Sequence, residues 1–216
     1  MKRNFRIAVG LLSLVAATQA QAVVVFSEDF ETLNGYTKSS TFFSVPPVIT
    51  TYVDLFNGDS FQTAANGTWA VLGNPASGVD LVGSAYAADF FGQYAVDLAG
   101  SPGPGSIKKS GLALTANSYQ ITFWLKPAGS LSDISTFDVK VNGVSQSFSN
   151  VSSNYYTFNF TGSISDLEFI SNATNNGNLF FDNLSVEAVP EPFTMALGAA
   201  GLALALKRRA KKTAKA

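Results

Sequence analysis

Alternation of apolar and polar residues with a period of two dominates the second half of the chain. In segment 119–126 the apolar positions are Tyr119, Ile121, Phe123 and Leu125, and the positions between them are Gln120, Thr122, Trp124 and Lys126. The same alternation recurs over 137–142, 156–161 and 167–169, and a final apolar segment covers 179–186. Because successive side chains of a strand point to opposite sides of a sheet, each segment is predicted to be a strand with one buried face.

Turn-forming residues separate these segments. Clusters of glycine, asparagine, serine and proline occur at 57–59, 73–75, 101–105 and 175–177. Asn142-Gly143 favours a two-residue hairpin turn between the strands on either side of it. No stretch between residues 23 and 188 has a helical period. Many short strands with frequent turns predict an all-β fold, which we expect to be a two-sheet antiparallel jelly-roll sandwich.

The N-terminus has the pattern of a secretory signal peptide. Three cations precede an apolar run from 7 to 17, and Ala20-Gln21-Ala22 follows with the small residues that a signal peptidase accepts. We therefore expect residues 1–22 to form a signal-peptide helix that is cut after Ala22, or alternatively after Ala20. A retained anchor is the other interpretation, but the apolar run is short for one.

The C-terminus combines an apolar run with a basic tail. Residues 193–206 carry no charge, and the tail 207–216 contains Lys207, Arg208, Arg209, Lys211 and Lys212. A membrane span usually needs roughly 20 apolar residues, so 193–206 predicts a short transmembrane helix, with a buried core helix as the alternative. Cations favour the cytoplasmic side, which would leave everything before Pro190 outside the membrane.

Pro190, Glu191 and Pro192 stand directly before that apolar run. The order of motif (189–192), short span and basic tail resembles the PEP-CTERM sorting signals of Gram-negative bacteria. This resemblance implies recognition by an exosortase, a transient stay in the inner membrane, and export to the cell surface or the extracellular matrix.

The charge of the chain is unevenly distributed. Nine of the 14 basic residues belong to the two terminal segments, so residues 23–192 hold five lysines against all 15 acids, a net charge of −10. An acidic domain argues against nucleic acid as a partner. The chain has no cysteine and no histidine, which excludes thiol chemistry, serine–histidine triads and histidine-bound zinc.

A second resemblance covers residues 26–187. It rests on the segments Trp69-Ala70-Val71, 78–83, 93–98, 105–107, 110–112, 119–123 and 181–186. Their order is similar to the galactose-binding-like jelly rolls of anchored bacterial surface proteins, the choice-of-anchor group. The resemblance implies that residues 23–188 form a binding or matrix ectodomain, usually associated with carbohydrate and without catalytic residues to transfer.

Asp182 shares its strand parity with Leu184 and Val186, so an unbroken strand would bury its carboxylate. Jelly rolls that resemble this one often join their first and last strands through calcium, and Glu28 and Asp29 near the first strand are the natural further ligands of a structural Ca²⁺. The alternative is that Asp182 caps a β-bulge through local hydrogen bonds.

Aromatic side chains are the candidates for sugar contact, because flat rings stack on sugar faces. Trp124 lies on the polar side of its strand and either forms a stacking platform or covers a loop. Trp69 and Tyr36 are further candidates, and Tyr155 is another. Tryptophan and tyrosine suit half-wet positions better than phenylalanine does, because they carry a polar group.

The sequence thus leaves three functions open. The first expectation is a non-enzymatic exopolysaccharide or biofilm matrix component. The second is a specific carbohydrate-binding module. The third is a carboxylate-based glycosidase, for which Asp80 and Asp97 are the candidate pair.

Overall fold

Short β-strands, all paired antiparallel, make up the regular structure of this computed structural model. The structure describes residues 21–44, 52–73, 77–84, 92–100, 103–128, 136–174 and 177–190. Within these ranges the strands form two sheets, which we name sheet A and sheet B.

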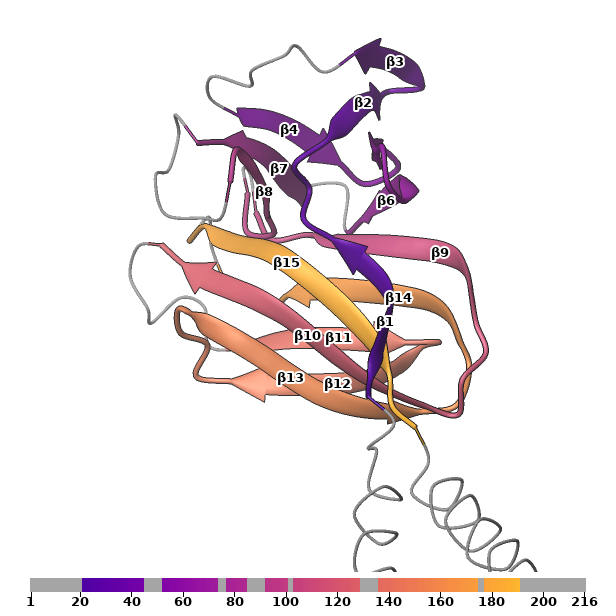
Figure 1. Ribbon diagram of the computed structural model, residues 1–216. Helices are drawn as coiled ribbons and strands as arrows, with labels where there is room; N and C mark the ends of the chain where they lie inside the picture. Colours follow the sequence, from indigo (N-terminus) through magenta and orange to yellow (C-terminus); the bar gives the residue numbers. More distant parts are fainter. Residues whose placement is uncertain are drawn as a thin grey trace, which may run out of the picture.

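Sheet A has seven strands in the order β13-β10-β15-β8-β7-β4, and β1 pairs with the second half of β15. The strands are β1 (Val23–Glu28), β4 (Tyr52–Phe56), β7 (Gly78–Gly83), β8 (Tyr94–Asp97), β10 (Ser118–Pro127), β13 (Asn154–Thr161) and β15 (Leu179–Ala188). Figure 1 shows β13, β10, β15 and β1 side by side, with β8, β7 and β4 continuing the sheet beyond β15.

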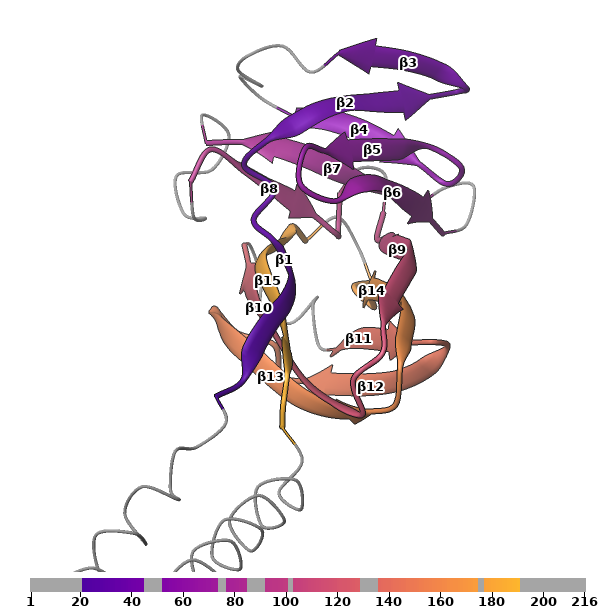
Figure 2. The same ribbon diagram turned by 45° about the vertical axis from the view of Figure 1, so that its right-hand side comes forward.

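Sheet B has eight strands in the order β12-β11-β14-β9-β6-β5-β2-β3. They are β2 (Leu33–Lys38), β3 (Thr41–Ser44), β5 (Ser60–Thr63), β6 (Gly67–Leu72), β9 (Ser106–Leu114), β11 (Thr136–Val141), β12 (Val144–Ser149) and β14 (Ile164–Ser171). In Figure 2, β9, β14, β11 and β12 lie across from β1, β15, β10 and β13, so the two sheets enclose one interior. The expected all-β, two-sheet antiparallel sandwich is confirmed.

The interior between the sheets is dominated by aromatic rings. Phe123, Phe137, Phe169 and Phe181 are fully buried, and the ring centroids of Phe169 and Phe181 are 4.5 Å apart across the two sheets. Rings in tilted and edge-on contact add attraction to the burial of their apolar surface. An aromatic core of this kind explains how a domain without cysteine is held together.

The alternation read from the sequence gives the correct faces for the strands that it identified. Tyr119, Ile121, Phe123 and Leu125 on β10 all point into the core. The turn predicted at 142–143 is also confirmed, because β11 and β12 pair as a hairpin in which both turn residues have positive φ.

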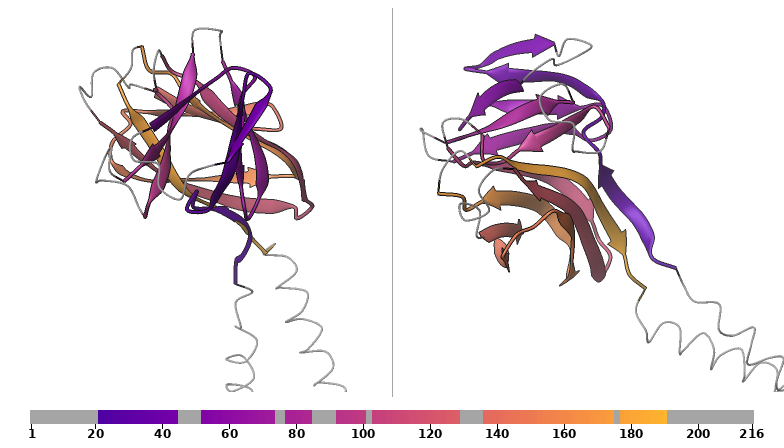
Figure 3. Two further views of the ribbon diagram at one scale, coloured as in Figure 1. Left: turned by 90° about the horizontal axis from the view of Figure 1, so that it is seen from above. Right: turned by 90° about the vertical axis from the view of Figure 1, so that its left-hand side faces the viewer.

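The first and last strands of the sandwich lie side by side. Val23 at the start of β1 pairs with Ala188 at the end of β15, so the chain enters and leaves at one end of the molecule (Figure 3). Pro190 is described, but residues 1–20 and 191–216 lie outside the described ranges. The two terminal helices, Glu191, Pro192 and the basic tail therefore stay predictions. No helix within the described ranges is long and apolar enough to cross a bilayer.

Candidate functional site

The face of sheet A that points away from the core carries a row of hydroxyl groups, and we call this face the outer face of sheet A. Strand register places Ser27, Ser185, Thr122 and Thr157 opposite one another on β1, β15, β10 and β13. Residues directly opposite one another across antiparallel strands share a face. Two neighbours in this row are in direct contact, since the hydroxyls of Thr122 and Thr157 are hydrogen bonded at 3.0 Å.

A pocket of about 480 Å³ opens over this row. Its lining is Ser27, Glu28, Asp29, Ala65, Thr122, Tyr155, Asn183, Leu184, Ser185 and Glu187. The Tyr155 side chain stands at the pocket with 49% of its surface exposed, and its hydroxyl accepts a hydrogen bond of 3.4 Å from the Asn183 amide. Hydroxyl, amide and carboxylate groups thus surround one accessible aromatic ring.

A β-bulge in β15 shapes one side of the pocket. The register between β10 and β15 shifts between Thr122 and Trp124, and Asn183 has a φ of 49° at that point. Asp182 Oδ1 accepts a 2.7 Å hydrogen bond from the Asn183 backbone N–H, which holds the bulge. Because of the extra residue, Asp182 pairs with Trp124 and shares its outward direction, while Leu184 points into the core. The bulge alternative for Asp182 is therefore the correct one.

The bulge also separates the three residues predicted to hold calcium. Glu28 pairs with Leu184 and points to the inner side of the sheet, whereas Asp182 points to the outer side. Asp29 follows β1 and lies at the pocket. No group of three or more acidic side chains in the described part of the chain is arranged to hold a metal ion. The structure thus does not bring Glu28, Asp29 and Asp182, the predicted calcium set, together, because Glu28 and Asp182 face opposite sides of the sheet.

Glu28 instead joins β1 to the β5–β6 hairpin through neutral donors. Its carboxylate is buried and accepts hydrogen bonds from the Phe30 N–H at 3.1 Å, Thr63 Oγ1 at 2.6 Å, Asn66 Nδ2 at 2.8 Å and Trp69 Nε1 at 3.3 Å. Four donors compensate the cost of burying this charge. Its role is to fix the hairpin against β1, beneath the pocket.

Lys109 lies near Glu28, and both burial and charge affect its pKa. Lys109 Nζ donates to the backbone carbonyls of Asn66 and Thr68. Burial lowers the pKa of Lys109, and the negative charge of Glu28 opposes that shift. The amine therefore belongs to the same arrangement of Glu28 and the β5–β6 hairpin.

The aromatic residues predicted to contact sugar lie in three different environments. Trp124 is 7% exposed and packs with Val82, Ala95 and Phe180 of neighbouring strands, so it is not an open stacking platform, and these contacts are with the sheet and not with the loop that the alternative interpretation named. Trp69 is fully buried in the core, so its assignment as a ligand-facing ring is wrong. Tyr36 on β2 stacks on Phe43 with ring centroids 5.2 Å apart, and it is not among the residues that line the pocket. Of the aromatic side chains named from the sequence, Tyr155 lines the pocket.

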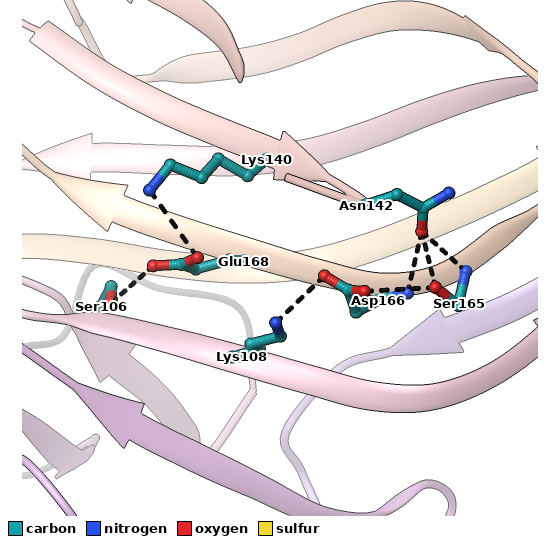
Figure 4. A network of polar contacts seen from close by, with 7 residues as sticks. All are labelled: Ser106, Lys108, Lys140, Asn142, Ser165, Asp166 and Glu168. Atoms are coloured by element: carbon teal, nitrogen blue, oxygen red, sulfur yellow. Dashed lines mark hydrogen bonds and ion pairs between the residues drawn. The ribbon is translucent and has the colours of Figure 1, made fainter. Parts of the chain in front are cut away.

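The outer face of sheet B has a different character, because its charges are paired. Lys108 contacts Asp166 at 3.2 Å, and Lys140 contacts Glu168 at 3.8 Å. Figure 4 shows how these side chains continue into hydrogen bonds with their neighbours; the residues drawn are Ser106, Lys108, Lys140, Asn142, Ser165, Asp166 and Glu168. Exposed pairs of this kind contribute little to stability, but they leave the face electrically balanced.

The two carboxylates considered for glycoside hydrolysis lie elsewhere on sheet A. Asp80 and Asp97 are opposite one another on β7 and β8. Their exposed fractions are 6% and 0%, so a polymer does not reach them. Burial raises the pKa of Asp97 to about 6, and hydrogen bonds from the Ala99 and Leu179 N–H groups oppose the rise.

Most of the pocket lining carries no signal in the sequence. The alternation along β10 predicts that Thr122 lies on the polar side of its strand, but no local pattern marks Ser27, Ser185 or Glu187. Only the pairing of β1 with β15 and of β15 with β10 brings them together.

The architecture is similar to that of solved carbohydrate-binding modules. A family 22 xylan-binding domain from Paenibacillus barcinonensis aligns with 12% identity and a TM-score of 0.40 over 81% of this chain and 100% of that domain. A family 22 module joined to a xylanase domain from Clostridium thermocellum aligns with 12% identity and a TM-score of 0.42 over 77% of this chain and 28% of that one. A family 29 module aligns with 19% identity and a TM-score of 0.34 over 64% of this chain and 93% of that module.

No protein-family model matches the chain, and no curated protein matches it in sequence. The similarities to solved structures therefore concern the β-sandwich fold alone.

Proposed function

We propose that the protein is a non-catalytic glycan-binding module that contacts its ligand through the pocket on the outer face of sheet A. The observation that carries this proposal is the exposed Tyr155 ring beside the hydroxyl row of Thr122 and Ser185. An aromatic face packs against the C–H groups of a sugar, while hydroxyl, amide and carboxylate groups bond to its hydroxyls. The jelly-roll connectivity expected from the sequence belongs to the same proposal.

This pocket favours specific binding over the purely structural matrix role that the sequence suggested first. A matrix filler needs no hollow lined by convergent polar groups, whereas binding sites are typically concave with a few such groups. The xylan-binding domain named above shows that a β-sandwich can serve this purpose, but the proposal stands on the residues of this chain.

The experiment is a titration of a panel of soluble glycans against the full chain and two variants. Tyr155→Ala should weaken binding by about fivefold to tenfold, since a well-placed ring contributes about 1 kcal/mol beyond its burial. Tyr52→Ala is the matched control, because Tyr52 is a tyrosine of similar exposure (43%) on β4, at the opposite edge of the same sheet. Equal binding by wild type and Tyr155→Ala would refute the assignment of this pocket.

The export route is also part of the proposal and is supported by the sequence. A signal peptide over 1–22 and a sorting signal over 189–216 would deliver the sandwich outside the inner membrane, with an exosortase cutting near Pro192. Mass spectrometry of the secreted protein should find a C-terminus near Pro192. Recovery of the intact basic tail from the medium would contradict this route.

A further inference from the structure

The charged side chains that line the pocket, Glu28, Asp29 and Glu187, are all acidic. Asp29 and Glu187 contribute carboxylates to its lining, and neither takes part in the ion pairs that the structure shows within its described ranges. Asp29 Oδ1 accepts one hydrogen bond, from the Glu31 N–H at 3.1 Å, which leaves its other oxygen available to a ligand.

Four of the described lysines have hydrogen-bond or ion-pair partners that are not part of the pocket lining. Lys108 and Lys140 pair with acids on the outer face of sheet B, and Lys109 is bound to backbone carbonyls near Glu28. Lys38 donates to the Asp54 carbonyl and lies over the Phe56 ring, 5.0 Å from its centroid.

Lys126 is the described lysine on β10, the strand that contributes Thr122 to the pocket. It lies four residues from Thr122, a distance of about 13 Å along an extended strand. The screening length is about 8 Å at physiological ionic strength, so its charge is weak at the pocket.

We infer that the pocket selects glycans without acidic groups, and that among these it prefers sugars that carry a free amine. This inference rests on the proposed function and adds the class of ligand. A neutral sugar offers its hydroxyls to Asp29 and Glu187 without repulsion. An ammonium group adds attraction to the same two carboxylates, whereas a uronate or a sulfate is repelled by them.

The size of the effect follows from Coulomb's law. Two unit charges about 5 Å apart change an affinity by about fourfold in bulk water and by over a hundredfold at the effective dielectric constant of a protein surface. We therefore expect a polyuronate to bind at least about fourfold more weakly per site than a neutral polymer. The difference should shrink as the salt concentration rises.

The test compares a neutral xylan, amine-bearing chitosan oligomers and polygalacturonate, each titrated against the full chain at low and high salt. The charge-neutral double variant Asp29→Asn/Glu187→Gln should raise the ratio of polygalacturonate affinity to xylan affinity by at least about fourfold. The double variant Asp138→Asn/Glu168→Gln removes the same two charges from the outer face of sheet B and should leave that ratio unchanged.

The outcomes separate this inference from the proposed function. Polygalacturonate binding as tight as xylan binding, or a ratio that the pocket variant does not change, overturns the charge selection and leaves glycan binding in place. Binding to none of the three polymers overturns the proposed function, and the inference falls with it.

Discussion

Asp97 gives the sharpest stability prediction, because its carboxyl is buried between strands at the centre of sheet A. Its side chain has no exposed surface, and its Oδ1 accepts hydrogen bonds of 2.9 Å from the Ala99 N–H and 2.7 Å from the Leu179 N–H. Oδ2 accepts no hydrogen bond from the described residues. Burial therefore raises the pKa of Asp97 from its ordinary value of 3.8 to about 6.

The direction of the pH effect follows from where the proton is held. Between pH 3.8 and about 6 the native protein keeps the Asp97 proton and the unfolded chain has lost it, so stability falls as pH rises through this window. Above the window the native state carries an ionised, buried carboxylate. A shift of one pKa unit corresponds to about 1.4 kcal/mol, so this cost reaches about 3 kcal/mol at neutral pH.

Asp97→Asn should remove that cost while keeping the two backbone hydrogen bonds. The amide oxygen can accept the hydrogen bonds from the Ala99 and Leu179 N–H groups. We expect the free energy of unfolding of the variant to rise relative to wild type by about 3 kcal/mol between pH 4 and pH 7.

Urea denaturation at a series of pH values measures this difference. Asp138→Asn serves as the control, since it removes an acid from β11 on the other sheet and should leave the shape of the wild-type pH profile unchanged. If the curves for wild type and Asp97→Asn run parallel from pH 4 to pH 7, the raised pKa is refuted.

Two further pairs of variants test individual contacts of the sandwich, each pair comparing a buried position with an open one. Glu28→Gln replaces one oxygen of a carboxylate that accepts four hydrogen bonds, and should lower the free energy of unfolding by about 3 kcal/mol. Glu168→Gln, on the exposed face of sheet B, should change it by less than about 1 kcal/mol in the same chemical denaturation. Gly105→Ala would bring a Cβ within 2.6 Å of the Gly78 carbonyl oxygen and should cost more than about 2 kcal/mol, whereas Gly143→Ala meets no atom and should cost about 1 kcal/mol for its positive φ. Equal free energies of unfolding within either pair of variants would contradict these contacts.

The fold was predictable because its signal is local. Alternation within 119–126 is visible in eight consecutive residues and gives both the strand and its buried side. The same alternation predicts a buried position for Trp69 and so speaks against a sugar-facing ring. Trp69 shares its parity with Val71, and both are buried on β6. A large aromatic residue on an apolar parity is a core residue first.

The pocket was not predictable, because it depends on register between distant segments. Ser27 and Ser185 meet only through the pairing of the first and last strands, and no local pattern fixes that alignment. The bulge at Asn183 then reverses the side on which Asp182 lies. The calcium prediction assumed an unbroken strand, whereas the one extra residue of the bulge places Asp182 on the opposite side of the sheet from Glu28.

The two outer faces of the sandwich differ in what their charges already bind. On sheet B, Lys108 and Lys140 neutralise Asp166 and Glu168 within the protein, so a charged ligand there would first have to displace an ion pair. On sheet A the carboxylates of Asp29 and Glu187 line a hollow beside an exposed ring, and no described lysine reaches them. Polar groups that are not already paired within the protein can bind a ligand, so we expect recognition on the outer face of sheet A. Because the uncompensated charge of this face is negative, the pocket should prefer neutral or positively charged ligands.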